Sequence, residues 1–359
     1  MKNKIQQYLL DLTHPELNQK FIIEKNIKSI IIEDNKIKLS IELNFPFKSQ
    51  EVLYEDLIKN CLQKITDLEV TINWSLKILS RQVQKGVNSI KGVKNIIAIA
   101  SGKGGVGKSS TAANIALALS AEGGNVGILD ADIYGPSQPQ MLGISPQKPN
   151  SKDGKSMEPI IAHSIQAMSI GFLVDQETPM VWRGPMVTST LEQLLKETNW
   201  DKLDYLIIDL PPGTGDIQLT LAQKIPVTGA IIVTTPQDIA LLDARRGLKM
   251  FEKVNIPILG IVENMSTHIC SKCDHEEHIF GKDGGKKMCA DYNTELLGSL
   301  PLDINIRKDL DDGKPTIIKN PESKISEVYR LIARKAALKV TKLTEDHSSK
   351  FPNIVIQQS

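Results

Sequence analysis

The segment Gly102–Ser109, which reads G-K-G-G-V-G-K-S, most constrains what this chain can fold into. Its spacing is typical of a phosphate-binding loop, in which successive main-chain N–H groups surround phosphate oxygens. Glycines are needed because a Cβ atom would hold the backbone away from the anion, and because several positions require a positive φ. In such a site a strand precedes the loop and a helix follows it, so that the N-terminus of the helix faces the phosphates.

The residues on either side fit this requirement. Residues 95–100 read N-I-I-A-I-A, a short apolar run that is typical of a buried parallel strand. Residues 110–121 have a helix-forming composition, with small side chains that allow close packing on a sheet. The sequence therefore predicts a nucleotide site in which Lys108 reaches the β- and γ-phosphates and the Ser109 hydroxyl coordinates Mg²⁺.

Apolar, strand-like runs alternate with helical segments through the rest of the chain. This alternation predicts an α/β fold, a P-loop NTPase with a mostly parallel sheet flanked by helices. The further predicted strands are residues 125–129, 205–208, 230–233, 258–262 and 296–299.

The first 83 residues look like a separate, small α+β domain. Residues 36–43 alternate in polarity as a half-buried strand does, and residues 51–65 have helical spacing. We expect a linker over residues 84–94, a nucleotide-binding domain over residues 95–343 and a polar, loosely held tail over residues 344–359.

Charge and hydropathy exclude several classes of function. The 359 residues carry 43 Lys and Arg against 42 Asp and Glu, so no global field favours nucleic acid or an anionic membrane. The chain has neither an apolar run of about 18 residues nor an N-terminal leader, and we expect a cytoplasmic protein. Residues 321–342 form a basic helix candidate, best interpreted as a closing helix with a solvated basic face.

Carboxylates follow two of the predicted strands at the sheet edge where α/β folds bind ligands. Asp209 ends the strand Tyr205–Asp209 and is suited to hold Mg²⁺ through its shell. Asp130 and Asp132 follow another strand, and a carboxylate there would orient or deprotonate an attacking water. Asp130 or Asp132, taken alone, also fits a structural cap on the next helix, although we favour the pair as a functional unit. The loop Leu210–Asp216 is placed to sense a γ-phosphate.

Cys270 and Cys273 form a C-x-x-C pair whose chemistry the residues alone leave open. Two thiolates are half of a tetrahedral metal site. Cys289, His268, His275 and His278 are the candidates to complete a zinc site within one chain. Alternatively, two chains would each supply two thiolates, the number an iron–sulfur cluster needs. A redox dithiol and inert thiols are weaker interpretations of the pair. Cys61 lies on an apolar face of a predicted helix, and we expect it in the protein core.

The loop with its additional lysine, Lys103, resembles the deviant Walker A of the MinD/ParA-like class of dimeric ATPases. Within that class, five segments in order resemble the Mrp/ApbC family of iron–sulfur cluster carriers. They read S-G-K-G-G-V-G-K-S-S-T, L-D-A-D-I-Y-G-P-S, I-I-D-L-P-P-G-T-G-D, E-N-M-S…C-S-K-C…I-F-G and G-S-L-P-L-D-I-N-I-R. The N-terminal domain is similar to the small assembly-type domain often attached to these carriers. It departs from that domain at residues 45–48, which read F-P-F-K where a Cys-Pro is usual, and this argues against a thiol role.

The resemblance implies a role for each matching residue. Lys103 would reach the nucleotide of a partner subunit, Lys108 and Asp132 would complete the catalytic set, and Ser109 would hold Mg²⁺. Cys270 and Cys273 would hold a 4Fe–4S cluster that bridges two subunits. ATP would contact the loop, Asp209, Asn264 and the region of Pro301. The loop residues are Gly102, Lys103, Gly104, Gly105, Val106, Gly107, Lys108, Ser109 and Ser110.

The resemblance therefore implies a homodimeric ATPase that receives an iron–sulfur cluster from scaffold donors and delivers it to apo-proteins. The balanced charge predicts no nucleic-acid partner. We also expect no stable membrane anchoring, because the basic helix candidate is not terminal and has no bulky aromatic stripe. Two alternatives remain: a MinD/ParA-like spatial-organising ATPase, and a P-loop ATPase with structural zinc at the C-x-x-C pair. Residues 180–185, which read M-V-W-R-G-P, have the character of a functional segment without an assignable role.

Overall fold

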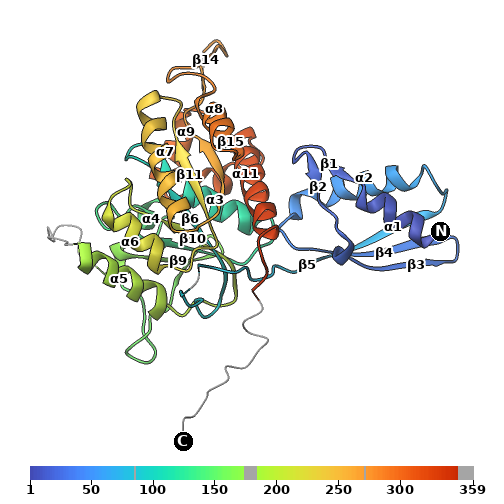
Figure 1. The fold of residues 1–359 in the computed structure, drawn as a ribbon, viewed down its shortest axis with the longest axis horizontal. Coiled ribbons are helices and arrows are strands. Elements are labelled where there is room, and N and C mark those ends of the chain that lie inside the picture. The colour runs from blue at the N-terminus through green and yellow to red at the C-terminus, as the bar shows by residue number, and fades with distance from the viewer. Residues whose placement is uncertain (85, 174–183, 271, 347–359) are drawn as a thin grey trace, which may run out of the picture.

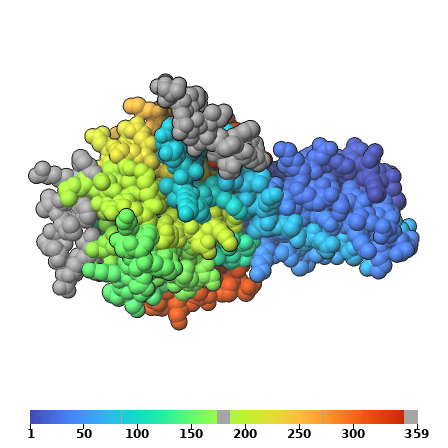
Figure 2. Space-filling view, turned by 90° about the horizontal axis from the view of Figure 1, so that it is seen from below, coloured from blue at the N-terminus to red at the C-terminus, as the bar shows by residue number. Residues whose placement is uncertain are grey.

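The computed structural model describes residues 1–84, 86–173, 184–270 and 272–346. A larger part, built on a central sheet, is joined by a smaller N-terminal part that projects from one side of it (Figure 1 and Figure 2). Residues 180–183 of the M-V-W-R-G-P segment and residues 347–359 of the expected tail lie outside the described residues.

Eight strands form the central sheet in the spatial order β15-β12-β11-β6-β10-β7-β9-β8. All neighbouring strands are parallel except β8, which runs antiparallel to β9. The mostly parallel sheet confirms the predicted fold class. Two of its strands were not predicted: β8 has only three residues, and β9, which reads I-Q-A-M-S, mixes polar and apolar residues. The strands are β6 (Val93–Ala100), β7 (Val126–Asp130), β8 (Ile160–Ala162), β9 (Ile165–Ser169), β10 (Leu203–Asp209), β11 (Gly229–Thr234), β12 (Ile258–Glu263) and β15 (Leu296–Ser299).

Helices cover both faces of this sheet because the central strands are apolar on both faces. In β6, Ile97 and Ile99 belong to one core, and Ile96 and Ala98 to the other. Figure 1 shows α3 and α11 on the side of the N-terminal part, with α5, α6 and α7 across the sheet. The helices are α3 (Lys108–Ala121), α4 (Gln138–Met141), α5 (Gly184–Glu197), α6 (Asp216–Lys224), α7 (Asp238–Lys253), α8 (Gly284–Asp291), α9 (Ile304–Asp311), α10 (Thr316–Lys319) and α11 (Lys324–Thr341).

The N-terminal part is a three-stranded sheet in the order β3-β4-β5 with two helices. β4 pairs antiparallel with β3 and parallel with β5, and it buries alternate residues as its pattern predicted. Asp34 and Asn35 join β3 to β4 with φ of 47° and 62°, the conformation of a tight hairpin turn. The elements are α1 (Lys2–Leu10), β1 (Thr13–His14), β2 (Gln19–Lys20), β3 (Ile27–Glu33), β4 (Lys36–Leu43), α2 (Glu51–Leu62) and β5 (Glu69–Leu76).

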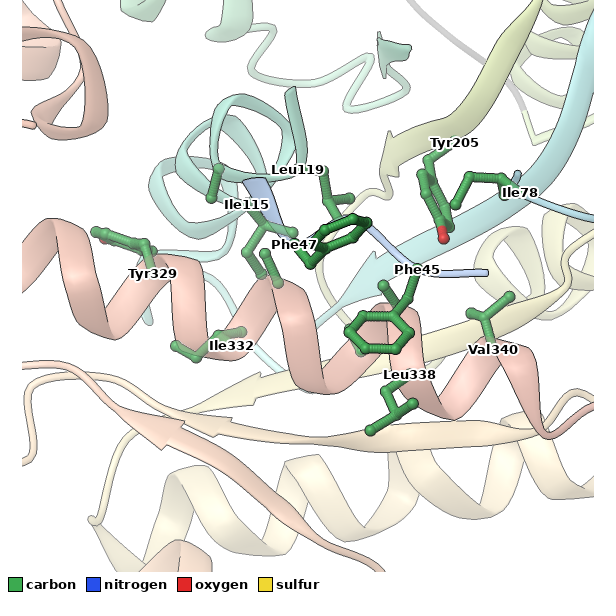
Figure 3. Close-up of a cluster of buried hydrophobic side chains, with 14 of the residues drawn as sticks. Phe45, Phe47, Ile78, Ile115, Leu119, Tyr205, Tyr329, Ile332, Leu338 and Val340 are labelled. Atoms are coloured by element: carbon green, nitrogen blue, oxygen red, sulfur yellow. The ribbon is translucent and has the colours of Figure 1, made fainter. Parts of the chain in front are cut away.

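An aromatic segment of the N-terminal part packs on the larger part. Phe45 and Phe47 are almost fully buried in the same apolar cluster as Leu119 of α3 and Leu338 and Val340 of α11. Figure 3 shows the two rings lying between these helices. The segment that carries Cys-Pro in similar domains is thus an apolar contact between the two parts of this chain.

A buried ion pair lies beside this apolar contact. Arg334 of α11 is 0% exposed and contacts Glu122, which follows α3 and is 1% exposed, at 2.8 Å. The same guanidinium contacts Glu16 of the N-terminal part at 3.1 Å and Glu327 of α11 at 2.6 Å. Ser49 completes the network, since its N–H and hydroxyl both donate to the Glu122 carboxylate. One arginine therefore forms ion pairs with carboxylates from three segments.

The basic C-terminal helix closes the core, as its pattern predicted. α11 buries Tyr329, Ile332, Ala333 and Ala336 against α3 and the sheet. None of the helices in the described residues is both long and apolar enough to cross a membrane.

Replacing Arg334 with leucine leaves Glu122 buried without its cation. We expect the variant to lose about 3–5 kcal/mol of unfolding free energy. Arg334→Leu combined with Glu122→Leu should recover part of this loss, because no unpaired charge remains. Urea denaturation would measure both.

The control is Lys59→Leu, which removes an exposed pair with Glu55 and should leave the urea midpoint nearly unchanged. An Arg334→Leu midpoint equal to that of the control would contradict this account of the domain contact.

Candidate functional site

The phosphate-binding loop joins β6 to α3 at the centre of the sheet. Gly105 and Gly107 have φ of 79° and 81°, and Gly107 is the residue that precedes the helix. Gly102 is needed for a different reason: a Cβ atom there would lie 2.1 Å from the main-chain carbon of Asp243 in α7. The surroundings of Gly104 are open, and Ser110 and Gly107 both line a cavity beside the loop. The loop therefore has the predicted conformation and is pressed against α7.

The predicted carboxylates meet the loop at the ends of two adjacent strands. Asp209 of β10 and Asp130 of β7 are register partners. Lys108 pairs with the fully buried Asp209 carboxylate, and its Nζ lies 3.6 Å from Asp132. The Ser109 hydroxyl is 3.3 Å from the same Nζ. The structure thus brings Lys108, Ser109, Asp132 and Asp209 into one cluster.

Asp130 and Asp132 have different surroundings. The Asp130 carboxylate accepts main-chain N–H groups of Asp132, Ser137 and Gln138 and the hydroxyl of Ser169. It therefore shapes the loop between β7 and α4, as in the capping interpretation, and not as the functional unit with Asp132 that we favoured. Burial raises the pKa of Asp132, while the neighbouring Lys108 lowers it. A carboxylate in such surroundings is suited to accept a proton.

The donors near Ser109 fit Mg²⁺. They are a hydroxyl and carboxylates, the hard oxygen ligands that this ion prefers, and Mg²⁺ commonly uses one or two carboxylates together with substrate phosphates. Ser109 would hold the ion and Asp209 would act through its shell, as predicted from the sequence.

Gln138 is a site residue that the sequence analysis missed. Its side chain is 1% exposed, and Nε2 donates to the Asp209 carboxylate at 2.9 Å and to the Ser109 carbonyl at 3.0 Å. The amide thus connects α4 to the loop and to β10. Its only signal in the sequence is its place shortly after the L-D-A-D strand end.

A cavity of about 400 Å³ lies beside the loop. Asn264 and Pro301, both predicted from the resemblance, line it together with Met265 and Leu302. The Asn264 side chain donates to the Val106 carbonyl at 2.9 Å, and a Cβ on Gly107 would lie 2.2 Å from its Nδ2. The opposite wall comes from α4 and α9, which the sequence analysis did not assign to the site. The volume suits a nucleoside.

Lys103 is half-buried near the start of the loop, with its carbonyl accepting the Ser101 hydroxyl at 2.8 Å. Within the described part of the chain, its ammonium group forms no ion pair, in contrast to that of Lys108. A function for this lysine in a partner subunit stays a prediction.

The C-x-x-C pair lies in a hairpin of two short strands, β13 (His268–Ile269) and β14 (Glu276–Glu277). The Cys270 N–H donates to the His275 carbonyl at 2.9 Å, and the Asp274 N–H donates to the Cys270 carbonyl at 2.9 Å. Cys270 is half-buried and Cys273 exposed. Hydrogen bonds from the Lys272 and Cys273 main chain, and from the Cys273 thiol, lower the pKa of Cys270. The Cys270 thiol therefore loses its proton more readily than an ordinary cysteine, and thiolate is the form that binds metal.

The candidates to complete a zinc site within one chain do not gather around this pair. Across the described ranges, no three His, Cys, Asp or Glu side chains come together as a metal site. Cys289 belongs to the buried side of α8 and is 6% exposed, and burial raises its pKa to about 11. His268 and His278 direct Nδ1 to main-chain carbonyls, those of Leu302 and Ser266. Cys61, expected in the core, is half-buried.

Comparisons with known proteins identify similar sequences and a similar solved structure. Residues 92–337 match the family described as ParA, NUBPL iron-transfer P-loop NTPase. The iron-sulfur cluster carrier protein of Haemophilus influenzae is 51% identical over 338 residues, which cover 94% of this chain and 91% of that protein. The iron-sulfur cluster transfer protein NUBPL of Mus musculus is 49% identical, over 72% of this chain and 81% of that protein. A solved structure of the nucleotide-binding protein of Archaeoglobus fulgidus with ADP has 35% identity and a TM-score of 0.57, over 65% of this chain and 90% of that one.

The cavity allows a direct test of nucleotide binding. Ile306 of α9 lines it and is 9% exposed, so Ile306→Trp would fill part of the space. We expect ATP affinity to fall about tenfold or more, because overpacking displaces the cavity walls or the ligand. Titration with a fluorescent ATP analogue would measure the affinity.

Ile304→Trp is the control, because Ile304 begins the same helix and is 59% exposed. Equal losses of affinity in the two variants would show that this cavity does not receive the nucleotide.

Proposed function

The chain belongs to the ParA family of NUBPL iron-transfer P-loop NTPases, and we propose that it is an ATP-hydrolysing carrier of 4Fe–4S clusters. Two copies of the chain would hold one cluster between them and transfer it to apo-proteins in the cytoplasm. The cluster is the cargo of this reaction, and ATP with Mg²⁺ drives the cycle. The names of the similar proteins from Haemophilus influenzae and mouse support the cargo.

The arrangement of Cys270 and Cys273 is the observation that carries this proposal. The two thiols are adjacent and accessible, and no third ligand joins them within the described residues. A 4Fe–4S cluster takes four thiolates. A two-fold axis at the hairpin would supply the remaining two from the same residues of the partner, in the isologous manner of most dimers.

The residues around Lys108 support ATP hydrolysis. Lys108 would move from Asp209 onto the β- and γ-phosphates, and the loop amides would bind their oxygens. Mg²⁺ at Ser109 and Asp209 would supply charge neutralisation on the phosphates. Asp132 would accept a proton from the water that attacks the γ-phosphorus, as the bond to the ADP oxygen breaks. Lys103 from the partner would stabilise the charge that develops on the leaving oxygen.

Exposed apolar residues near the loop support the dimer. Ile239 and Leu242 of α7 are 69% and 54% exposed, and α7 is the helix that contacts Gly102. A Cβ on Gly284 would lie 2.8 Å from Leu241, so α8, which follows the cysteine hairpin, also adjoins α7. Ile269 in the hairpin is 52% exposed. In the dimer, this apolar face would pack against the partner subunit. Lys103 and the thiol pair would then lie at the same interface.

Loading the protein with iron and sulfide tests the cargo. After anaerobic reconstitution, we expect broad visible absorption with about four iron and four sulfide per dimer. Cys270→Ser/Cys273→Ser should abolish both, whereas Cys61→Ser in α2 should retain them. Stoichiometric zinc without iron uptake would favour the structural-zinc alternative and overturn the proposal.

Ile239→Arg/Leu242→Arg tests the dimer surface. Burying two unpaired charges at an interface costs several kcal/mol, so we expect the variant to stay monomeric with ATP in light-scattering chromatography. Ile161→Arg is the control, because Ile161 is 66% exposed on β8, at the other edge of the sheet. An ATP-dependent dimer of the α7 variant would rule out this surface.

A further inference from the structure

A short segment connects the cavity to the thiol pair. Residues 264–268, which we call the connector, run from the end of β12 to the cysteine hairpin. At one end Asn264 and Met265 line the cavity, and Asn264 holds the Val106 carbonyl of the loop. Met265 has a φ of 55°, a conformation that non-glycine residues adopt rarely and that here turns the chain out of the sheet. Cys270 follows the connector after one further residue.

Hydrogen bonds fasten the connector to residues 300–302, which follow β15. The Ser266 N–H and hydroxyl donate to the Leu300 carbonyl at 2.9 and 3.0 Å. The Leu302 N–H donates to the Thr267 carbonyl at 2.7 Å. Pro301 and Leu302 line the cavity as well. The connector and residues 300–302 therefore form one hydrogen-bonded unit that lines the cavity.

Two histidines extend this unit into the hairpin. Nδ1 of His268, on the first leg, lies 3.1 Å from the Leu302 carbonyl. Nδ1 of His278, on the returning leg, lies 2.9 Å from the Ser266 carbonyl. A carbonyl oxygen only accepts hydrogen bonds, so both rings must carry their proton on Nδ1. Both legs of the hairpin are thus fastened to the residues that surround the cavity.

We propose that His268 and His278 are positioning residues that couple occupancy of the nucleotide cavity to the Cys270–Cys273 pair. A nucleotide in the cavity holds the connector against residues 300–302, and the two histidines pass this restraint to the hairpin. The coupling is reciprocal: the factor by which a nucleotide raises the affinity of the thiols for a metal is also the factor by which the metal raises the affinity for the nucleotide. This inference rests on nucleotide binding in the proposed function, but not on the identity of the cargo.

Thiol modification measures the coupling without any cluster. Metal-free protein would react with iodoacetamide, with and without saturating Mg-ADP, and mass spectrometry would follow the peptide that contains Cys270 and Cys273. We expect nucleotide to slow modification of the wild-type pair about fivefold, the lower end of ordinary coupling. His268→Phe/His278→Phe keeps an aromatic ring at each position but removes the Nδ1 donors. The nucleotide effect should then nearly disappear. Each single variant should show an intermediate effect.

His275→Phe is the matched control, since His275 lies exposed in the same hairpin and its carbonyl, which the substitution keeps, accepts the Cys270 N–H. It should retain the full nucleotide effect. Titration with fluorescent ADP and thermal melting would verify that the double variant still binds nucleotide and folds. If it fails to fold, the two single variants decide the question.

Equal modification rates with and without nucleotide in the wild type, at proven saturation, would overturn the inference. An unchanged nucleotide effect in the histidine variants would do so as well. Failure of the proposed function would look different: either the wild type binds no nucleotide at all, or it takes up no iron while the thiol effect persists.

Discussion

The buried pairing of Lys108 with Asp209 and Asp132 is the interaction on which the rest of this structure depends. Parallel strands bring their carboxyl ends to one edge of the sheet, so β7 and β10 deliver their carboxylates to the place where the loop turns into α3. Isolated charges at this depth would be strongly unfavourable, and the lysine makes the cluster tolerable. Gln138 then connects the cluster to α4, which forms part of the cavity wall.

Helix α3 connects this cluster to the contact with the N-terminal part. It begins at Lys108 and is followed by Glu122, the carboxylate that Arg334 neutralises beside the N-terminal part. The main-chain N–H groups of Phe47 and Lys48 also donate to the Glu122 carbonyl. One helix of 14 residues therefore has the phosphate loop at its start and the domain contact at its end.

Both faces of the sheet and the phosphate loop were predictable because their patterns are local. The strand 36–43, the helix of residues 51–65 and the strand that ends at Asp209 were recognised from periodicity and from the residues that follow them. The strands β8 and β9 escaped because their residues are few or mixed in polarity. The bonds of Gln138 and the cavity wall from α9 escaped because they depend on neighbours distant in sequence. The contacts of Asp130 also needed the structure, since a carboxylate at this position fits both a cap and a residue that activates water.

The nucleotide loop could be recognised from its residues alone, because a glycine-rich turn between a strand and a helix has few other uses. The α/β class followed from the alternation of apolar runs and helical segments, and the thiol pair from its spacing. Only the tertiary structure decided which groups surround the thiols. In sequence, His268, His278 and Cys289 are all near enough to be ligands. In the fold, Cys289 belongs to the core, and the two histidines bond to carbonyls beside the cavity. Spacing along a chain limits reach, whereas burial and hydrogen bonding decide where each side chain lies.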